Sequence, residues 1–316
     1  MNLITAFFKL IRWPNLFFIA LTQWLFYHCI VLSLEMNHLE TFIPFHFHFL
    51  LLMMASVFIA AAGYIINDYF DLQIDIVNKP EKVVVDKTVK RRWAIILHIL
   101  FSIAGIILSG MVSYYTKKWV IVLGNVGSVL LLWVYSTRFK KKLLIGNIVI
   151  AALTGWVILV VYFYAGATLI NYKGWTMHLY PYDIKRLFKL TVLYVGFAFV
   201  LSLIREVVKD LEDMYGDAQF NCQTMPIVLG VPATKVFVAV WIVVCVLSLL
   251  VVQLYAWQLG WWISSLYAIF FIVVPLLWVL KNLFQASAAK DYHRLSIQLK
   301  VVMLAGILSM LFFKIL

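Results

Sequence analysis

Long stretches without a single charged residue alternate along the chain with short, highly charged segments. A helix that crosses a lipid bilayer needs about 20 predominantly apolar residues. The uncharged runs that come close to or exceed this length are 13–34, 41–67, 93–116, 119–137 and 143–172. Each of these runs predicts one membrane-spanning helix.

The run 236–280 is long enough for two spanning helices. Its natural break lies at Gln258, Gly260, Trp261 and Trp262, where polar and interfacial residue types gather. Two further runs, 190–204 and 301–313, are short for a span, but basic residues flank both of them. Long basic side chains can extend toward the membrane surface, so we count these runs as spans too. The total prediction is about nine transmembrane helices.

Composition excludes a water-soluble protein. Of the 316 residues, 65% are hydrophobic and only 13% are charged, whereas soluble domains carry about 25% charged residues. In lipid, the backbone can satisfy its hydrogen bonds only in helices or closed barrels, and these runs are far too long for barrel strands. The predicted fold class is therefore all-α, a polytopic membrane protein. No linker or low-complexity tract divides the chain, so we expect residues 1–316 to form a single membrane-embedded domain.

The basic residues predict an orientation. If the N-terminus is cytoplasmic, 19 of the 26 Lys and Arg residues fall in cytoplasmic segments, which agrees with the positive-inside rule. The net charge of +12 is then explained by topology and anionic membrane lipid, and it does not indicate nucleic-acid binding. We expect a multi-pass protein of the cell (inner) membrane.

Acidic residues gather in two short segments that each directly follow an apolar run. The first contains the pattern N-D-x-x-D-x-x-x-D at Asn67, Asp68, Asp71 and Asp75. The second repeats D-x-x-D-x-x-x-D at Asp210, Asp213 and Asp217. Both segments fall on the cytoplasmic side in the predicted topology.

Offsets of three and seven place three carboxylates along one stripe of a helix, with neighbouring Cβ atoms about 5–6 Å apart. At an effective dielectric constant of ~20, each neighbouring pair repels by roughly 3 kcal/mol. A cation would relieve this repulsion, and hard oxygen ligands without His or Cys suit Mg²⁺, which also binds phosphate oxygens. A single motif of this kind is usually a solvated polar face, but two copies with identical offsets favour a shared site for Mg²⁺ and an anion.

Basic residues occupy the same cytoplasmic layer. Lys82 follows the first motif, Lys140 lies in the segment YSTRFKKK that begins at Tyr135, and Arg205 precedes the second motif. Most such residues serve topology alone. Interleaved with carboxylates, some are better explained as partners for a diphosphate, which Arg can bind with two parallel hydrogen bonds.

With these motifs in place, the chain resembles the UbiA superfamily of intramembrane prenyltransferases over almost its entire length. Besides the two aspartate motifs, the resemblance rests on R-x-P-N at Arg12, Pro14 and Asn15 and on Y-S…K…G-N at Tyr135, Ser136, Lys140, Gly146 and Asn147. It implies nine transmembrane helices around a central cavity, with the aspartate motifs capping the cavity on the cytoplasmic side.

Within the superfamily, the segment Arg205–Asp217 and the T-M-P at 224–226 are most similar to digeranylgeranylglyceryl phosphate synthases and their bacterial relatives. Two positions depart from the family pattern. The family usually has R-P-x-x-x-G after the first motif, where this chain has Lys82 followed by three valines, and Asn221 stands where Gly is usual.

The resemblance implies a chemistry. Two Mg²⁺ ions would bridge the diphosphate of an allylic prenyl donor. Their expected ligands, which are also the expected catalytic residues, are Asp68, Asp71, Asp75, Asp210, Asp213 and Asp217. Lys82, Lys140 and Arg205 would stabilise the leaving group. Asn67 would orient the first motif or reach the diphosphate, and Tyr135 would contact substrate.

Three functions are weighed. The first is transfer of a prenyl group, expected to be geranylgeranyl, to a lipid acceptor such as geranylgeranylglyceryl phosphate. The second is prenylation of an aromatic quinone precursor. The third is a membrane transporter, which is disfavoured because transporter sites lie near the bilayer midplane, whereas these carboxylates lie at the membrane edge.

Overall fold

The computed structural model describes residues 2–36, 47–81, 83–168 and 181–315. Within these ranges all regular elements are helices. The β-type backbone pairing found there is an isolated bridge between Val85 and Val89. The described part of the chain therefore confirms the all-α prediction.

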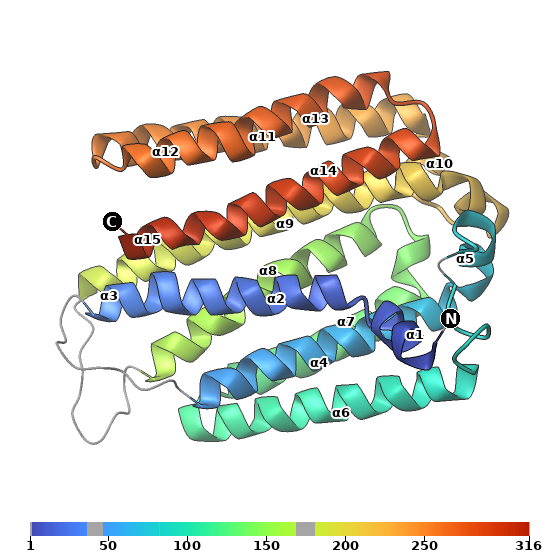
Figure 1. Cartoon of the computed structure of the whole chain (residues 1–316), viewed down its shortest axis with the longest axis horizontal. Helices are drawn as coiled ribbons and strands as arrows, with labels where there is room; N and C mark the ends of the chain where they lie inside the picture. The colour runs from blue at the N-terminus through green and yellow to red at the C-terminus, as the bar shows by residue number, and fades with distance from the viewer. Residues whose placement is uncertain (1, 37–46, 82, 169–180, 316) are drawn as a thin grey trace. The chain divides into compact units, whose positions relative to one another are not determined.

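Nine helical segments in the described ranges are long and apolar enough to cross a membrane (Figure 1). They are Trp13–Leu34, Phe47–Phe70, Arg91–Thr116, Trp119–Thr137, Ile145–Gly166, Ile184–Gln219, Gly230–Gln258, Trp262–Gln285 and Ala289–Lys314. The predicted number of spans is confirmed. The break after Gln258 is confirmed too, because Gly260 there adopts φ +81°, a left-handed conformation that glycine permits at a helix end.

The two short runs lie within much longer helices. Run 190–204 is part of α9 (Pro181–Gln219), and run 301–313 begins inside α14 (Ala289–Leu308). Lys, Arg and Glu are good helix formers, so a charged residue does not end a helix whose backbone bonds are satisfied internally. As a consequence Arg205 and Lys300 lie within helices instead of at their ends, which matters for the site.

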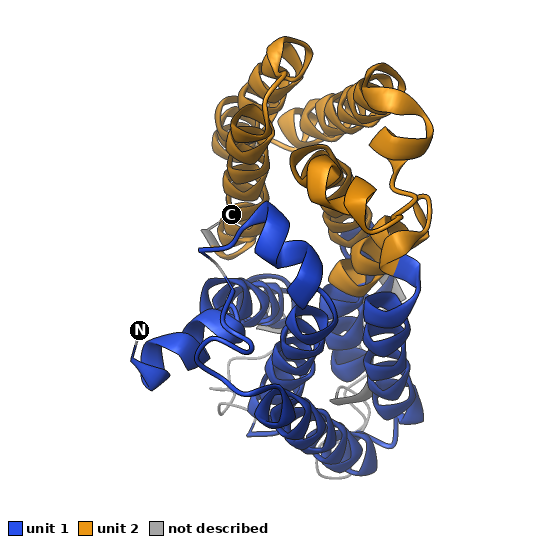
Figure 2. Ribbon diagram, turned by 90° about the vertical axis from the view of Figure 1, so that its right-hand side faces the viewer, with its two compact units in different colours: residues 1–139, 156–192 blue, residues 140–155, 193–316 orange. Residues whose placement is uncertain are grey.

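The described chain separates into two compact units (Figure 2). Unit 1 comprises residues 1–139 and 156–192, and unit 2 comprises residues 140–155 and 193–316. Helices α8 (Ile145–Thr168) and α9 contribute to both units. The single domain over 1–316 stays a prediction.

Unit 1 is built on three neighbouring helices. Its helices are α1 (Leu3–Leu10), α2 (Trp13–Leu25), a π-helical turn (Phe26–Val31), α3 (Leu32–Met36), α4 (Phe47–Phe70), α5 (Leu72–Asn78), α6 (Arg91–Thr116) and α7 (Trp119–Thr137). Helices α4, α6 and α7 lie side by side (Figure 1). The indole of Trp156 donates to Asn125 Oδ1 at 2.8 Å, and Asn125 Nδ2 donates to Ser109 Oγ at 2.7 Å. These two hydrogen bonds join α8, α7 and α6, and interhelical bonds of this kind help to hold membrane helices together.

Unit 2 is built on α9 and the C-terminal helices. Its other helices are a 3₁₀ turn (Phe139–Lys141) that begins at the end of unit 1, α10 (Met225–Val228), α11 (Gly230–Gln258), α12 (Trp262–Ala268), a π-helical turn (Ile269–Val273), α13 (Val274–Gln285), α14, a 3₁₀ turn (Ser309–Leu311) and α15 (Phe312–Ile315). Aliphatic side chains of α9, α11, α13 and α14 form one buried core, which includes Ile204, Ile242, Leu276 and Leu299. The core holds α9 and α14 in the same packed layer of helices.

We predict that Gly124→Ala destabilises the protein by about 1–3 kcal/mol, because overpacking a close helix contact forces neighbours to move. A Cβ at Gly124 would lie 2.0 Å from the ring of Trp156, whose position is fixed by its bond to Asn125. Gly127→Ala is the matched control on α7, since no atom lies within 4 Å of a Cβ there. Thermal unfolding in detergent should show a lower midpoint for Gly124→Ala alone; equal midpoints would contradict the packing of α7 against α8.

Candidate active site

The first aspartate motif lies at a bend between two helices. Helix α4 ends at Phe70, α5 begins at Leu72, and Asp71 between them has φ −84° and ψ −2°. Backbone bonds with helical spacing continue through the bend, from Asp71 N to Asn67 O at 2.9 Å and from Asp75 N to Asp71 O at 2.8 Å. The sequence predicted three carboxylates along one straight helix. The backbone instead bends at Asp71, because a ψ near zero tilts the next peptide away from helical geometry.

Asn67 holds the carboxylate of Asp71. Its amide Nδ2 donates to Asp71 Oδ2 at 2.5 Å, and the Asp71 residue is only 3% exposed. Asn67 Oδ1 is buried and has no hydrogen-bond partner within the described ranges. The amide thus fixes one carboxylate oxygen and brings an additional oxygen acceptor to the motif.

Arg12 neutralises Asp68. Its Nη2 lies 2.6 Å from Asp68 Oδ1, and its guanidinium stands 5.2 Å from the centre of the Tyr64 ring. The negative charge of Asp68 raises the pKa of Arg12 above its ordinary value, so the guanidinium remains protonated. Arg12 has φ 50° at the turn between α1 and α2, and this turn brings its side chain to the motif. In the sequence, Arg12 belongs to the R-x-P-N pattern, but it was not predicted as a site residue.

The N-terminal helix also binds the segment after the first motif. Lys9 Nζ donates to the carbonyl oxygen of Glu81 at 2.7 Å. Ala6 and Leu10 are fully buried in the same core cluster as Val83, Val84, Val85 and Val89. The three valines that replace the family's usual pattern therefore anchor this segment by apolar packing. Lys82 lies outside the described residues.

The second motif differs because α9 continues without a break through Asp210, Asp213 and Asp217. The predicted single-helix spacing is found here. Asn147, in the first turn of α8, donates from Nδ2 to Asp210 Oδ2 at 2.8 Å. Asp217 is 5% exposed. Each motif therefore has one asparagine amide that binds one of its carboxylates.

Asn147 was not among the predicted site residues. The available signal was its place in the Y-S…K…G-N segment, together with the analogous asparagine at position 67. The remaining predicted residues lie on separate elements. Tyr135 is partly buried near the end of α7, Lys140 is in the 3₁₀ turn that follows, and Arg205 on α9 binds Glu206 at 3.1 Å.

The donor set suits Mg²⁺. It consists of carboxylate oxygens and amide oxygens, which are hard ligands, and it includes the buried Asn67 Oδ1. Across the described ranges, no three His, Cys, Asp or Glu side chains are close enough to form a metal site by themselves. Mg²⁺ commonly uses one or two protein carboxylates and completes its shell with phosphate and water. The first motif belongs to unit 1 and the second to unit 2, and their sharing of one diphosphate stays a prediction.

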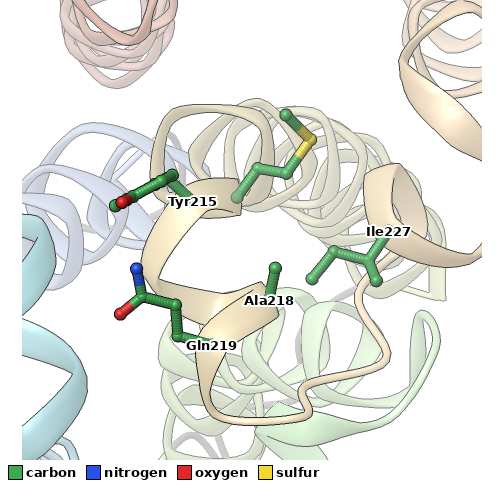
Figure 3. A pocket seen from close by; sticks show the side chains of 5 residues that line it. Tyr215, Ala218, Gln219 and Ile227 are labelled. Atoms are coloured by element: carbon green, nitrogen blue, oxygen red, sulfur yellow. The ribbon is translucent and has the colours of Figure 1, made fainter.

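An apolar pocket of about 480 Å³ lies beside the second motif (Figure 3). Its lining residues are Met214, Tyr215, Ala218, Gln219 and Ile227. No side chain of this lining carries a charge.

Comparison with known proteins identifies a family. The family model described as UbiA prenyltransferase family matches residues 29–304. The digeranylgeranylglyceryl phosphate synthase of Methanobrevibacter smithii is 29% identical over 203 residues, which cover 62% of this chain and 62% of that protein. That match therefore spans less than two thirds of the relative's length.

Two solved structures share the fold. A structure concerning digeranylgeranylglyceryl phosphate synthase in membranes has a TM-score of 0.59 at 23% identity, covering 98% of this chain and 99% of that one. A UbiA homolog from Archaeoglobus fulgidus bound to DMAPP and Mg²⁺ has a TM-score of 0.57 at 14% identity, covering 96% and 99%. These similarities support the all-α membrane fold expected from the resemblance.

We predict that Arg12 and Asp68 are energetically coupled. Their side chains are 36% and 17% exposed, so the pair is better shielded from water than an ordinary surface ion pair. Arg12→Met and Asp68→Asn should each destabilise the protein by about 1–3 kcal/mol, and the double variant should cost less than the sum by about 1 kcal/mol. The free energy of unfolding in detergent is measured for the wild type, both single variants and the double variant, which together form a double-mutant cycle. Arg138→Met, at an exposed position, is the control. Strict additivity would contradict the pairing.

Proposed function

This chain belongs to the UbiA prenyltransferase family, and we propose that it transfers a prenyl group from a prenyl diphosphate donor to a lipid acceptor in a Mg²⁺-dependent reaction. The observation that carries the proposal is the pair of aspartate motifs, each with one carboxylate bound by an asparagine amide. Oxygen-rich sites of this kind bind divalent cations together with phosphate groups.

Both aspartate motifs are proposed to take part in holding the cations and the donor diphosphate. The proposed ligands are Asp68, Asp71 and Asp75 of the first motif and Asp210, Asp213 and Asp217 of the second. Bound Mg²⁺ supplies positive charge opposite the departing diphosphate. Asn67 and Asn147 each hold one oxygen of a carboxylate and so keep the other oxygen oriented.

The remaining residues have supporting roles in this proposal. Arg12 keeps Asp68 ionised and in place. Lys140, and Lys82 outside the described residues, add positive charge near the leaving group. Tyr135 contacts the donor. The apolar spans exclude water, so that the carbon–oxygen bond to the diphosphate breaks in a dry site.

For the substrates we propose a geranylgeranyl donor and geranylgeranylglyceryl phosphate as the acceptor. The support is the similarity to the Methanobrevibacter smithii relative named digeranylgeranylglyceryl phosphate synthase. In this reaction the acceptor hydroxyl loses its proton and forms an ether bond to the prenyl carbon, while diphosphate departs. The alternative acceptor is an aromatic quinone precursor, which would form its new bond at a ring carbon or oxygen.

Transfer activity provides the test. Membranes containing the protein are incubated with labelled geranylgeranyl diphosphate, Mg²⁺ and either the phosphorylated glyceryl lipid or an aromatic acceptor. We expect diphosphate release and labelled ether lipid with the former alone. Labelled product from the aromatic acceptor alone would replace the proposed acceptor, and absence of diphosphate release with both would reject the enzyme function.

We predict that Asp71→Ala and Asp213→Ala each abolish transfer, a loss of at least about 100-fold, because each removes a carboxylate from one motif. Both variants should remain inserted in the membrane. Glu81→Ala is the control, since this carboxyl side chain lies outside the motifs on an exposed residue. Near-normal Mg²⁺-dependent turnover in either aspartate variant would remove the metal assignment.

The nine apolar helices indicate a multi-pass membrane protein, and we propose that its N-terminus and active site face the cytoplasm. The native cysteines Cys29, Cys222 and Cys245 are buried, so a single introduced cysteine can report its side of the membrane. In intact cells a membrane-impermeant maleimide should label Lys117→Cys and spare Glu81→Cys. The reverse labelling pattern would invert the topology.

A further inference from the structure

The N-terminal helix α1 exposes apolar side chains although it is not one of the membrane spans. Its inner face is buried, with Ala6 and Leu10 in a core cluster of unit 1. Leu3, Ile4 and Phe8 are exposed, and the last two are neighbours on one side of the helix because they are four residues apart. A helix that is apolar beyond its buried face needs a further apolar partner.

Helix α1 ends where the first membrane span begins. That span starts at Trp13, and Arg12 before it has φ 50°, so the chain turns there and α1 does not continue the line of α2 (Figure 1). Trp13 and Phe17, in the first turns of the span, are exposed as the outer face of α1 is. Tryptophan is enriched where a span meets the membrane surface. This arrangement is typical of an amphipathic helix that lies along that surface.

The beginning of α6 lies beside α1. The ring centre of Phe7 on α1 is 6.3 Å from that of Phe101 on α6, and Ala94 belongs to the same buried cluster as the inner face of α1. Figure 1 shows α1 at the end of unit 1 where α6 begins. Successive spans cross a membrane in alternating directions, so the first span and the third, which is α6, both begin on one side.

Exposed basic residues cover this start of α6. They are Lys87, Lys90, Arg91 and Arg92, which we name the basic patch. They outnumber the exposed acids of the preceding segment, Glu81 and Asp86. Trp93, the next residue along the chain, is exposed too. Exposed cations beside an exposed tryptophan suit a surface that meets anionic lipid headgroups.

This surface is tied to the first aspartate motif by contacts on both elements. Arg12, at the end of α1, binds Asp68, and Lys9 donates to the segment that follows the motif. The guanidinium of Arg91 lies 4.9 Å from the centre of the Tyr69 ring, which follows Asp68 along α4. The positions of α1 and of the basic patch therefore bear directly on the residues of the motif.

We propose that the exposed face of α1 and the basic patch together bind anionic lipid of the membrane in which the protein lies. Ile4 and Phe8 enter the apolar edge of the leaflet, while the patch binds lipid phosphates through charge-assisted hydrogen bonds. The bound lipid holds α1 in place and so keeps Arg12 on Asp68. A second copy of the chain is a poorer partner, because it would bring the same positive patch.

Local hydrogen exchange tests the lipid partner. The full chain is placed, one copy per disc, in nanodiscs of phosphatidylcholine with or without phosphatidylglycerol. The backbone amides of residues 3–10 should exchange at least about threefold more slowly in the anionic discs, because bound lipid opposes local opening of the helix. Added salt should remove this difference, since it screens the attraction. Equal exchange in both discs at low salt would overturn the proposal.

Charge variants locate the effect. Lys90→Gln/Arg92→Gln should exchange at one rate in both kinds of disc. Lys281→Gln/Lys290→Gln is the matched control, since it removes the same charge from exposed positions of unit 2, and it should keep the wild-type difference. A lipid effect that survives in Lys90→Gln/Arg92→Gln would place the lipid on another surface. If that variant is not monodisperse, the salt dependence of the wild type decides the matter.

Apolar variants test the other half of the surface. Phe8→Ser should raise the exchange of residues 3–10 in both kinds of disc, because it removes an apolar anchor. Phe8→Leu, which keeps an apolar side chain at this position, should exchange as the wild type does. Unchanged exchange in Phe8→Ser would show that α1 does not enter the leaflet.

Transfer activity in the same discs separates this inference from the proposed function, on which its catalytic consequence rests. Wild-type turnover should be at least about threefold higher in anionic discs, and Lys90→Gln/Arg92→Gln should lack this gain. A lipid effect on exchange without any transfer would reject the proposed function and keep the lipid site. Transfer without a lipid effect on exchange would reject the lipid site alone, and equal transfer in both discs would reject its influence on the motif.

Discussion

Negative charge at the edge of an apolar helix bundle is the constraint on which the rest of the structure depends. Carboxylates in a low-dielectric region repel each other strongly and lose favourable contact with water. The chain relieves this cost with a guanidinium at Asp68 and with asparagine amides at Asp71 and Asp210. These partners orient the carboxylates and leave other oxygens to face a cation, so the same contacts that stabilise the fold prepare the site.

Helix α9 combines the two kinds of charge in one rigid element. Its aspartates follow one another at helical spacing, and Glu206 binds Arg205 and Lys209 on the turns that precede them. Because an α-helix fixes the rise and rotation between residues, the separation of the two groups is set by the backbone and not by flexible loops.

Much of the architecture follows from local pattern. Uncharged runs, two of them short but flanked by basic residues, predicted all nine spans and the break after Gln258, because apolar length and glycine conformation act over a few residues. The helices that contain runs 190–204 and 301–313 extend well beyond these runs, because a charged residue does not by itself end a helix. The sequence also predicted a straight helix through the first motif, where the backbone bends at Asp71. Neither feature depends on hydrophobic period, so the pattern could not reveal it.

The amino-acid sequence by itself determined the helical membrane fold and the positions of six aspartates with repeated spacing. Only the tertiary structure decided which partners those carboxylates and the basic residues receive. Arg12 and Asp68 are 56 positions apart, and Asn147 and Asp210 are 63 apart. His293 meets Glu212 only through the packing of α14 against α9. Periodicity reports which face a residue occupies on its own helix, whereas the helix that covers that face is chosen by packing of the whole unit.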